Sequence, residues 1–401
     1  MNKAFSKGAS AIFLMLLTLG GCATTVEPTM TTRYPLEFNV AMKALAEQLF
    51  TQVRNNQNVL TRIGNTTLVV DPFIDANTAE VTETSREIEL EVYAEAKRAF
   101  PNFAVERINA NNIGKANYVI GGIIRLDDYQ SGAKAAGRFY RVSASVTDLK
   151  TGMVIANTDV WVANKVLKHA AVGTYQESPM YLKDRRAEGY ITTAVTPAGN
   201  KADQEYFASL PTAALLVEAD KAYEDKRLKD AESLLKMAET RTDGKVMKTY
   251  AALYLIYRKL NQPTEAEKMF ARLVDVGLEN KNISTRLLFT VNSTDFVSDS
   301  DLRDQYSLWL RQIGRKVATS NVCLHIVGHS SRTGAERYND ALSRQRAEAV
   351  QSAMLRNNAE LAGKVKADGR GFRDNIIGTG TDDAQDAIDR RVEFTVTNCG
   401  K

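Results

Sequence analysis

Hydrophobic positions in the N-terminal part of the chain follow two different periods. Residues 38–53 carry apolar side chains at every third or fourth position, and the charged residues 83–100 are also amphipathic, so we expect two helices. Runs rich in β-branched and aromatic residues predict the strands 67–71, 103–108, 118–124, 138–147 and 153–162. Residues 148–152 suit a hairpin connection between the last two strands. The pattern predicts an α/β sheet domain over residues 36–165.

A helical period returns over residues 206–280. Ala231 and Ala266 are 266 − 231 = 35 positions apart, close to the period of about 34 residues in helix-turn-helix repeats of the tetratricopeptide type. Small residues there let paired helices approach, and Leu235 and Phe270 fill the space between them. Two such units are fewer than the roughly three that a free-standing array needs, so we expect them to pack on a neighbouring domain. A plain helical bundle is the alternative.

Residues 166–205 show no sustained period. They are polar and contain Pro179, Pro197 and Gly199, which interrupt helices and strands. We interpret this segment as an inter-domain linker with at most a short hairpin.

A strand, a polar turn and a helix follow one another near the C-terminus. Residues 322–327 are apolar apart from His325, and residues 328–334 are rich in Gly and Ser. Ala347, Val350 and Met354 then form an apolar helical stripe. Arg346 stands one position before that stripe, so it can reach back over the end of the strand.

The order of these residues resembles the OmpA-like C-terminal domain, the module that ties bacterial outer membranes to peptidoglycan. Residues 288–292 and residues 389–394 agree with the same resemblance. It implies a βαβαββ domain over residues 283–401. The fold class of the whole chain is therefore expected to be mixed α+β, with an N-terminal sheet domain, a helical segment and this domain in sequence.

The resemblance also implies a peptidoglycan site. In the family an Asp after the second strand and an Arg fifteen residues later hold the diaminopimelate of a stem peptide. The Arg is Arg346 here, and 346 − 15 = 331 is Ser331, so the acid is missing. The other residues that surround the ligand in the family correspond to Asn292, Thr333, Asn339 and Arg390. A neutral hydrogen bond in place of a charged one weakens binding by about ten-fold or more. Glu336 is an alternative acid, and pairing of the arginines with local acids is the alternative interpretation.

The N-terminus has the pattern of an export signal. Basic residues precede an apolar run over residues 11–19, which is too short to cross a bilayer. Leu19-Gly20-Gly21-Cys22 resembles a bacterial lipoprotein cleavage box. This implies a signal peptide over residues 1–21, a multiply acylated Cys22 (palmitate among its acyl chains) and a lipidated tether over residues 22–35. A soluble secreted protein with an incidental cysteine is the alternative.

Cys323 and Cys399 remain after lipidation. In an oxidising compartment an isolated pair is a disulfide candidate. If their strands are antiparallel neighbours, the two thiols meet at one sheet edge. Two separate buried thiols are the alternative.

Composition and motifs argue against several classes of function. The net charge of +4 is small and evenly spread, which does not indicate nucleic-acid binding. His325 and His329 lack a third ligand at metal spacing, so no metal site is expected. Because no nucleophile, paired carboxylates or phosphate-binding loop is found, we expect neither an enzyme nor a cofactor.

Together these features predict an outer-membrane lipoprotein that faces the periplasm. It would dock on peptidoglycan through its C-terminal domain and present the N-terminal domain to a periplasmic protein partner. The N-terminal pattern resembles curli-secretion, flagellar-surface and penicillin-binding-protein-activator lipoproteins. The alternative function is a regulatory or assembly lipoprotein for an envelope machine or cell-wall synthase, whose C-terminal domain has lost peptidoglycan binding.

Overall fold

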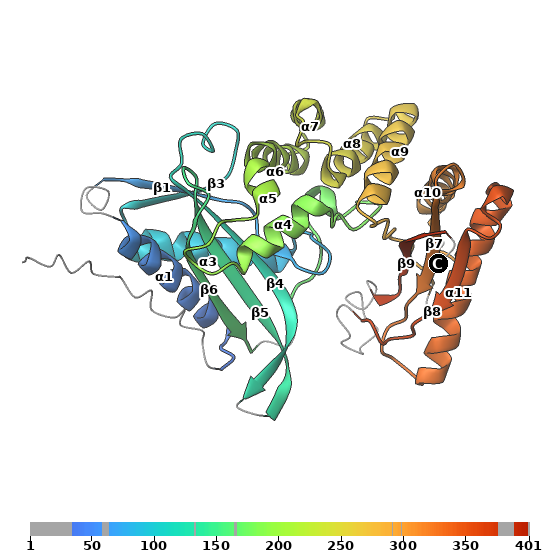
Figure 1. The fold of residues 1–401 in the computed structure, drawn as a ribbon, viewed down its shortest axis with the longest axis horizontal. Helices are drawn as coiled ribbons and strands as arrows, with labels where there is room; N and C mark the ends of the chain where they lie inside the picture. The colour runs from blue at the N-terminus through green and yellow to red at the C-terminus, as the bar shows by residue number, and fades with distance from the viewer. Residues whose placement is uncertain are drawn as a thin grey trace, which may run out of the picture.

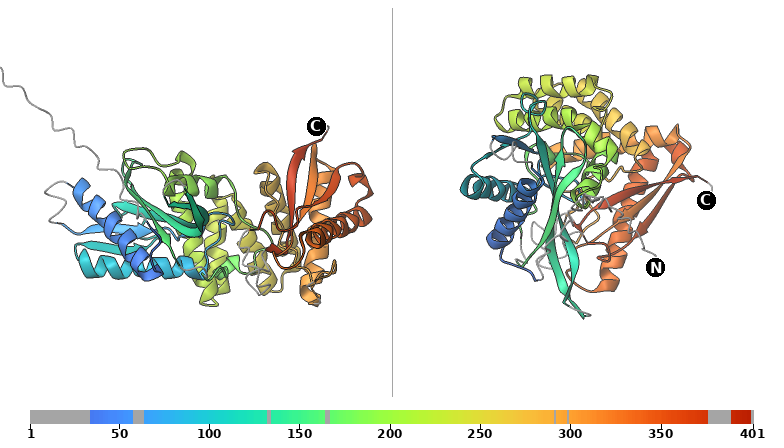
Figure 2. Two further views of the ribbon diagram at one scale, coloured as in Figure 1. Left: turned by 90° about the horizontal axis from the view of Figure 1, so that it is seen from below. Right: turned by 60° about the vertical axis from the view of Figure 1, so that its left-hand side comes forward.

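The computed structural model describes residues 34–57, 64–131, 134–163, 167–290, 292–297, 299–375 and 389–399 of the 401-residue chain. Two sheets lie toward opposite ends of the molecule, with helical hairpins between them (Figure 1). Figure 2 shows the same order along the long axis. The predicted mixed helix-and-sheet class is confirmed. No helix in these ranges is both long and apolar enough to span a membrane.

The N-terminal sheet is mixed and has the order β3-β1-β4-β5-β6, with β2 paired to β4. Its strands are β1 (Thr66–Val70), β2 (Ile74–Asp75), β3 (Phe103–Arg107), β4 (Tyr118–Ser131), β5 (Lys134–Asp148) and β6 (Val154–Val162). β1 is parallel to β3 and β4, whereas β4, β5 and β6 are antiparallel. β4 and β5 are longer than predicted. Their ends pair with each other but are polar, so the sequence there has no apolar run that would indicate a strand.

Helices cover both faces of this sheet. α1 (Phe38–Asn56) and α3 (Glu83–Ala99) share a core with Ile120 and Ile124 of β4. α4 (Arg185–Ala194) and α6 (Leu210–Glu224) share a second core with Val119 and Ile123 of the same strand. Successive side chains of a strand point to opposite faces, so β4 contributes to both cores.

Two glycines in β4 allow close contacts on either side of the sheet. A Cβ at Gly122 would lie 2.1 Å from the Phe73 ring, and one at Gly121 would lie 3.2 Å from the Tyr190 ring. The Tyr190 hydroxyl accepts a hydrogen bond from the Gly122 amide at 2.7 Å and donates to the Pro72 carbonyl at 2.8 Å. Tyr190 thus fastens α4 to the middle of the sheet.

The segment predicted to be a linker is packed instead. Within residues 167–205 the chain forms η1 (Gly173–Tyr175), α4 and the start of α5 (Gln204–Ala208), and the described residues contain no hairpin. Met180, Leu182 and Tyr190 are buried. The prediction was wrong because irregularly spaced side chains and hydrogen bonds to distant backbone groups hold this segment. Such contacts produce no periodic pattern in the sequence.

Two helical hairpins follow. α6 pairs with α7 (Leu228–Thr240), and α8 (Met247–Lys259) pairs with α9 (Pro263–Glu279). Ala231 and Ala266 lie buried in the second helix of each hairpin. The Phe270 ring stacks on Trp309 of α10 (Ser300–Ala318), with 5.9 Å between ring centres. The hairpins therefore share one continuous core with the C-terminal sheet.

The C-terminal sheet has the order β8-β7-β9. Its elements after α10 are β7 (Val322–Gly328), α11 (Glu336–Asn357), η2 (Ala359–Leu361), β8 (Val365–Gly369) and β9 (Val392–Asn398). β7 is parallel to β8 and antiparallel to β9. The expected βαβαββ order places a first strand near residues 288–292. In the described residues there, Phe289 and Phe296 make an isolated bridge, and Asn292 turns the chain with a φ of 53°.

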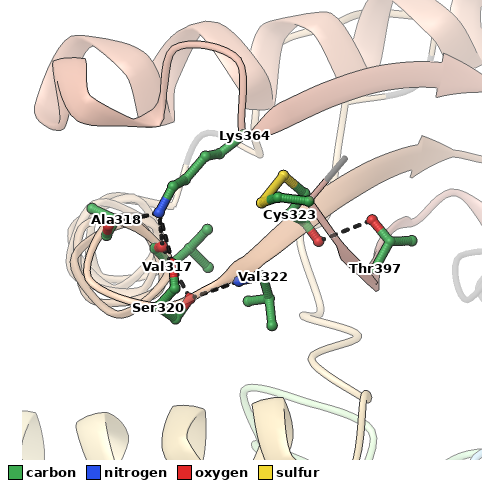
Figure 3. Close-up of a disulfide and its surroundings, with 8 residues drawn as sticks. Val317, Ala318, Ser320, Val322, Cys323, Lys364 and Thr397 are labelled. Carbon is green, nitrogen blue, oxygen red and sulfur yellow. Dashed lines mark hydrogen bonds between the residues drawn. A yellow bond between two sulfur atoms is a disulfide. The ribbon is translucent and has the colours of Figure 1, made fainter. Parts of the chain in front are cut away.

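A disulfide joins Cys323 of β7 to Cys399, just after β9, with 5.0 Å between the Cα atoms (Figure 3). The two strands are antiparallel neighbours in which Cys323 pairs with Thr397. Nearby, the Lys364 ammonium donates to carbonyl oxygens at and just after the end of α10, those of Val317, Ala318 and Ser320 (Figure 3). The disulfide and the Lys364 hydrogen bonds both lie near the start of β7. The other end of the strand is at Gly328.

Candidate peptidoglycan pocket

The end of β7 meets α11 at very short range. A Cβ at Gly328 would lie 1.9 Å from the carbonyl oxygen of Ser343 in α11. The strand can pass the helix this closely because glycine has no side chain. The chain then runs through buried His329, Ser330 and Ser331 to the first turn of α11. The close approach brings residues of α11 over the end of the strand. The sequence predicted this position for Arg346.

A pocket of about 280 Å³ opens at this point. It is lined by Asn292, Ser330, Ser331, Thr333, Gly334, Tyr338, Asn339, Leu342, Arg346 and Arg390. The structure thus brings together every residue that the sequence assigned to the peptidoglycan site. Sequence analysis did not assign Ser330, Gly334, Tyr338 or Leu342 to it. Their positions in the sequence could have indicated them, because each lies within four positions of an assigned residue.

Arg346 is the most enclosed charged residue of the pocket. Its side chain is 1% exposed. Its Nε donates to the Ser293 carbonyl at 3.1 Å, and one terminal nitrogen donates to the Thr290 carbonyl at 3.2 Å. The guanidinium also lies 5.2 Å from the centre of the Phe289 ring. These contacts fix the plane of the guanidinium before any ligand arrives.

The turn over residues 289–296 supplies these contacts. The Thr290 amide donates to the Asp295 carbonyl at 2.9 Å, and the Phe289 and Phe296 rings pack at a tilt with 5.1 Å between their centres. Asn292 has positive φ, which asparagine tolerates better than most residues. The turn therefore holds Arg346 from one side and presents Asn292 to the pocket.

The remaining lining is polar. Asn339, 3% exposed, donates through its amide to the carbonyls of Thr333 at 2.9 Å and Ala335 at 3.3 Å. These bonds hold the loop before α11 in place. Ser331 is 6% exposed and contributes a hydroxyl where the sequence resemblance implied a carboxylate. The described lining residues include two arginines and no acid.

Glu336 does not take the place of the missing acid. Its side chain is 61% exposed and binds Arg373 at 3.1 Å. Asp340, one turn further along α11, binds the same arginine at 2.8 Å. Both acids thus bind Arg373, and neither lines the pocket.

A second polar cluster lies behind the pocket. The Arg391 Nε donates to Glu393 at 2.6 Å, and buried His329 lies 3.6 Å from the other Glu393 oxygen. Burial alone would raise the pKa of Glu393, yet the neighbouring His329 and Arg391 lower it to about 2. The carboxylate therefore stays charged and links β9 to the residue that follows β7.

Cys22, the predicted lipidation site, lies outside the described residues. Within the described ranges no group of three or more His, Cys, Asp or Glu side chains is placed to hold a metal ion.

Comparison with known proteins finds a family match over a range that includes all of the pocket lining except Asn292 and Arg390. Residues 296–389 match the OmpA family. Outer membrane protein Omp38 of Acinetobacter baumannii is 28% identical over 120 residues, which are 30% of this chain and 32% of that protein. The chain thus spans about a third of the length of the curated relatives that it matches.

Solved structures with similar chains include a lipoprotein and a cell wall anchor. The peptidoglycan-associated lipoprotein from Burkholderia pseudomallei is 25% identical, with 28% of this chain and 88% of that chain covered and a TM-score of 0.24. The cell wall anchor of the T6SS from Pseudomonas aeruginosa is also 25% identical, with 28% and 75% covered and a TM-score of 0.23.

Proposed function

With an OmpA-family domain at residues 296–389, we propose that this protein is a non-enzymatic outer-membrane lipoprotein that docks on peptidoglycan. The pocket beside Arg346 would hold the diaminopimelate of a stem peptide. The observation that carries the proposal is the convergence of Asn292, Ser331, Thr333, Asn339, Arg346 and Arg390 on one pocket. These residues come from four separate stretches of the chain.

The pocket chemistry suits a carboxylate. An arginine presents a planar fork that grips two carboxylate oxygens at once. Arg346 is already oriented by the carbonyls of Ser293 and Thr290, so little side-chain freedom is left to lose on binding. The serine, threonine and asparagine groups add neutral hydrogen bonds around it.

Membrane attachment is proposed to rest on Cys22. The residues up to Cys22 resemble a lipoprotein signal, and residues 22–35 would form the tether. Cys22→Ser removes the acylation site, so the protein should leave the outer-membrane fraction. Unchanged detergent partitioning of this variant would refute the lipid anchor.

The N-terminal sheet domain is proposed to present a surface to a periplasmic protein. Support for this role comes from the resemblance of its element order to that of other envelope lipoproteins. If the pocket does not bind the wall, the rival function remains, in which the C-terminal domain contacts protein in a regulatory or assembly complex.

Co-sedimentation with purified peptidoglycan sacculi tests the proposal. The full chain in detergent should sediment with the sacculi, and Arg346→Ala should reduce binding by about ten-fold or more, since a charged hydrogen-bonding group is lost. Arg337→Ala is the matched control, because Arg337 is an exposed arginine of the same helix that does not line the pocket. Equal sedimentation of both variants and the unmutated protein would contradict the proposed site.

A further inference from the structure

The outer edge of β6 is bonded to side chains of a helix. β6 is the last strand in the order of the N-terminal sheet, next to β5, and α1 lies alongside it (Figure 1). One edge of β6 pairs with β5, so the backbone groups on its other edge point away from the sheet. Backbone groups on the edge of a sheet are a template for pairing with a strand of another chain.

Gln52 of α1 bonds to Asn157 of β6 as a neighbouring strand would. The Gln52 side-chain Nε2 donates to the Asn157 carbonyl at 3.0 Å, and its Oε1 accepts from the Asn157 backbone amide at 3.1 Å. In an antiparallel ladder, a hydrogen-bonded residue pair exchanges the same two kinds of bond. Glutamine can take the place of the strand because its side-chain amide carries both a donor and an acceptor.

Two further side chains of α1 extend this contact along β6. Asn56 donates to the Ile155 carbonyl at 2.7 Å. Gln48 accepts a hydrogen bond from the Thr158 hydroxyl. Residues four positions apart lie on one face of a helix, so Gln48, Gln52 and Asn56 form a row that faces β6.

Other segments of the chain bond to the two ends of β6. At its end, the Leu36 amide donates to the Trp161 carbonyl at 2.9 Å, and the Leu36 carbonyl accepts from the Ala163 amide at 2.7 Å. At its start, the Val154 amide donates to the Asn200 carbonyl at 2.8 Å. The row on α1 thus covers the middle of an edge whose ends are also bonded.

We infer that the row of Gln48, Gln52 and Asn56 closes the outer edge of β6 against a strand from a second copy of this chain. The row takes hydrogen bonds that such a strand would need, so α1 would have to be displaced first. The apolar core that α1 shares with the sheet opposes this displacement. A second copy is the expected partner, because the same edge of two chains can pair about a two-fold axis. The inference concerns the N-terminal domain and does not depend on the proposed binding of peptidoglycan.

Gln52→Leu tests the inference, because leucine is of similar size and can form neither bond with Asn157. The full chain is kept in detergent with micelles in excess over protein. The variant should associate at a protein concentration about ten-fold lower than the unmutated chain does, since two backbone groups of the edge lose their partner. Sedimentation velocity measures this association. In dilute, unassociated protein, hydrogen exchange at the Asn157 backbone amide should become about ten-fold faster.

Two controls separate edge pairing from other causes of association. Lys43→Leu places the same apolar side chain on α1 at a position that is 53% exposed and pairs with Glu47, and it should sediment like the unmutated chain. The second control adds Asn157→Pro to Gln52→Leu. Proline removes the outward amide and is tolerated on an edge strand at such a position, so the double variant should sediment like the unmutated chain.

The inference is overturned if Gln52→Leu exchanges faster at Asn157 but associates no more than the unmutated chain does. Unchanged exchange at Asn157 would also overturn it, since the Gln52 contact would then not protect the strand. Association that persists in the double variant would place the contact on another surface and would reject the role of the β6 edge. Asn56→Leu removes one bond to the strand and should shift both measurements in the same direction by less. This milder variant decides the question if Gln52→Leu does not fold.

Discussion

Arg286 and Glu80 form an ion pair across 206 positions of sequence, with an Arg286 terminal nitrogen 3.0 Å from a Glu80 oxygen. Glu80 is 2% exposed and precedes α3, whereas Arg286 follows α9. The same nitrogen donates to the Tyr175 carbonyl at 2.7 Å, and the guanidinium lies 5.2 Å from the Tyr181 ring. One side chain thus ties together the N-terminal sheet, the connecting segment and the entrance to the C-terminal domain.

Arg286→Met should destabilise the protein by about 3–5 kcal/mol, because it leaves the buried Glu80 carboxylate without its partner. The double variant Glu80→Gln with Arg286→Met should lose much less, since no charge is then left buried. Urea unfolding of both variants measures the difference. A single variant as stable as the double variant would show that the unpaired Glu80 carboxylate carries no cost.

Gly328→Ala should cost about 1–3 kcal/mol, because the added methyl group meets the backbone of α11 at Ser343, which cannot rotate away. The shift of α11 should also weaken the proposed wall binding, since this helix carries Asn339 and Arg346. Gly114→Ala is the control, with no heavy atom within 4 Å of its new Cβ. Denaturant midpoints of the two variants should differ clearly. Equal midpoints would mean that strand and helix can separate without loss.

Removal of the Cys323–Cys399 disulfide should lower stability by about 2–4 kcal/mol, because the bond closes a long loop with a sequence separation of 76. The variant with both cysteines changed to alanine, compared with the oxidised protein in urea, measures this loss. Alkylation of the native protein without reductant should label neither residue. Labelling of both would show that the bond is not formed.

Asp71→Asn should flatten the dependence of stability on pH. Burial raises the pKa of Asp71 above its ordinary value, although Arg186 and a hydrogen bond from Tyr206 partly oppose this. The folded protein then holds this proton more tightly than the unfolded chain does. Stability therefore falls as pH rises from about 4, the unfolded value, through the raised pKa of the folded state.

Urea midpoints at pH 5 and pH 8 test this sign. The unmutated protein should lose more stability between these values than Asp71→Asn does. Asp304→Asn, at an exposed position of α10, is the control and should behave like the unmutated protein. If Asp71→Asn keeps the full pH dependence, other groups are responsible for it.

Local spacing and a family resemblance together identified the candidate pocket. Ser331 and Arg346 belong to one strand-turn-helix unit, so their separation along the chain limits their separation in space. The resemblance of that unit to a known domain added Asn292 and Arg390 from distant stretches. The strands and helices with regular periods were also found, because a repeating apolar face is a property of the segment itself.

The sequence by itself determined where periodic segments lie and which residues of the strand-turn-helix unit can converge. Only the tertiary structure decided that residues 167–205 are packed, that Glu336 and Asp340 bind Arg373, and that Arg286 pairs with Glu80. The physical reason is that apolar periodicity is a property of a single helix or strand. A buried polar pair depends instead on how two elements distant in sequence pack against each other. Residue identity alone does not specify the partner that satisfies a buried charge.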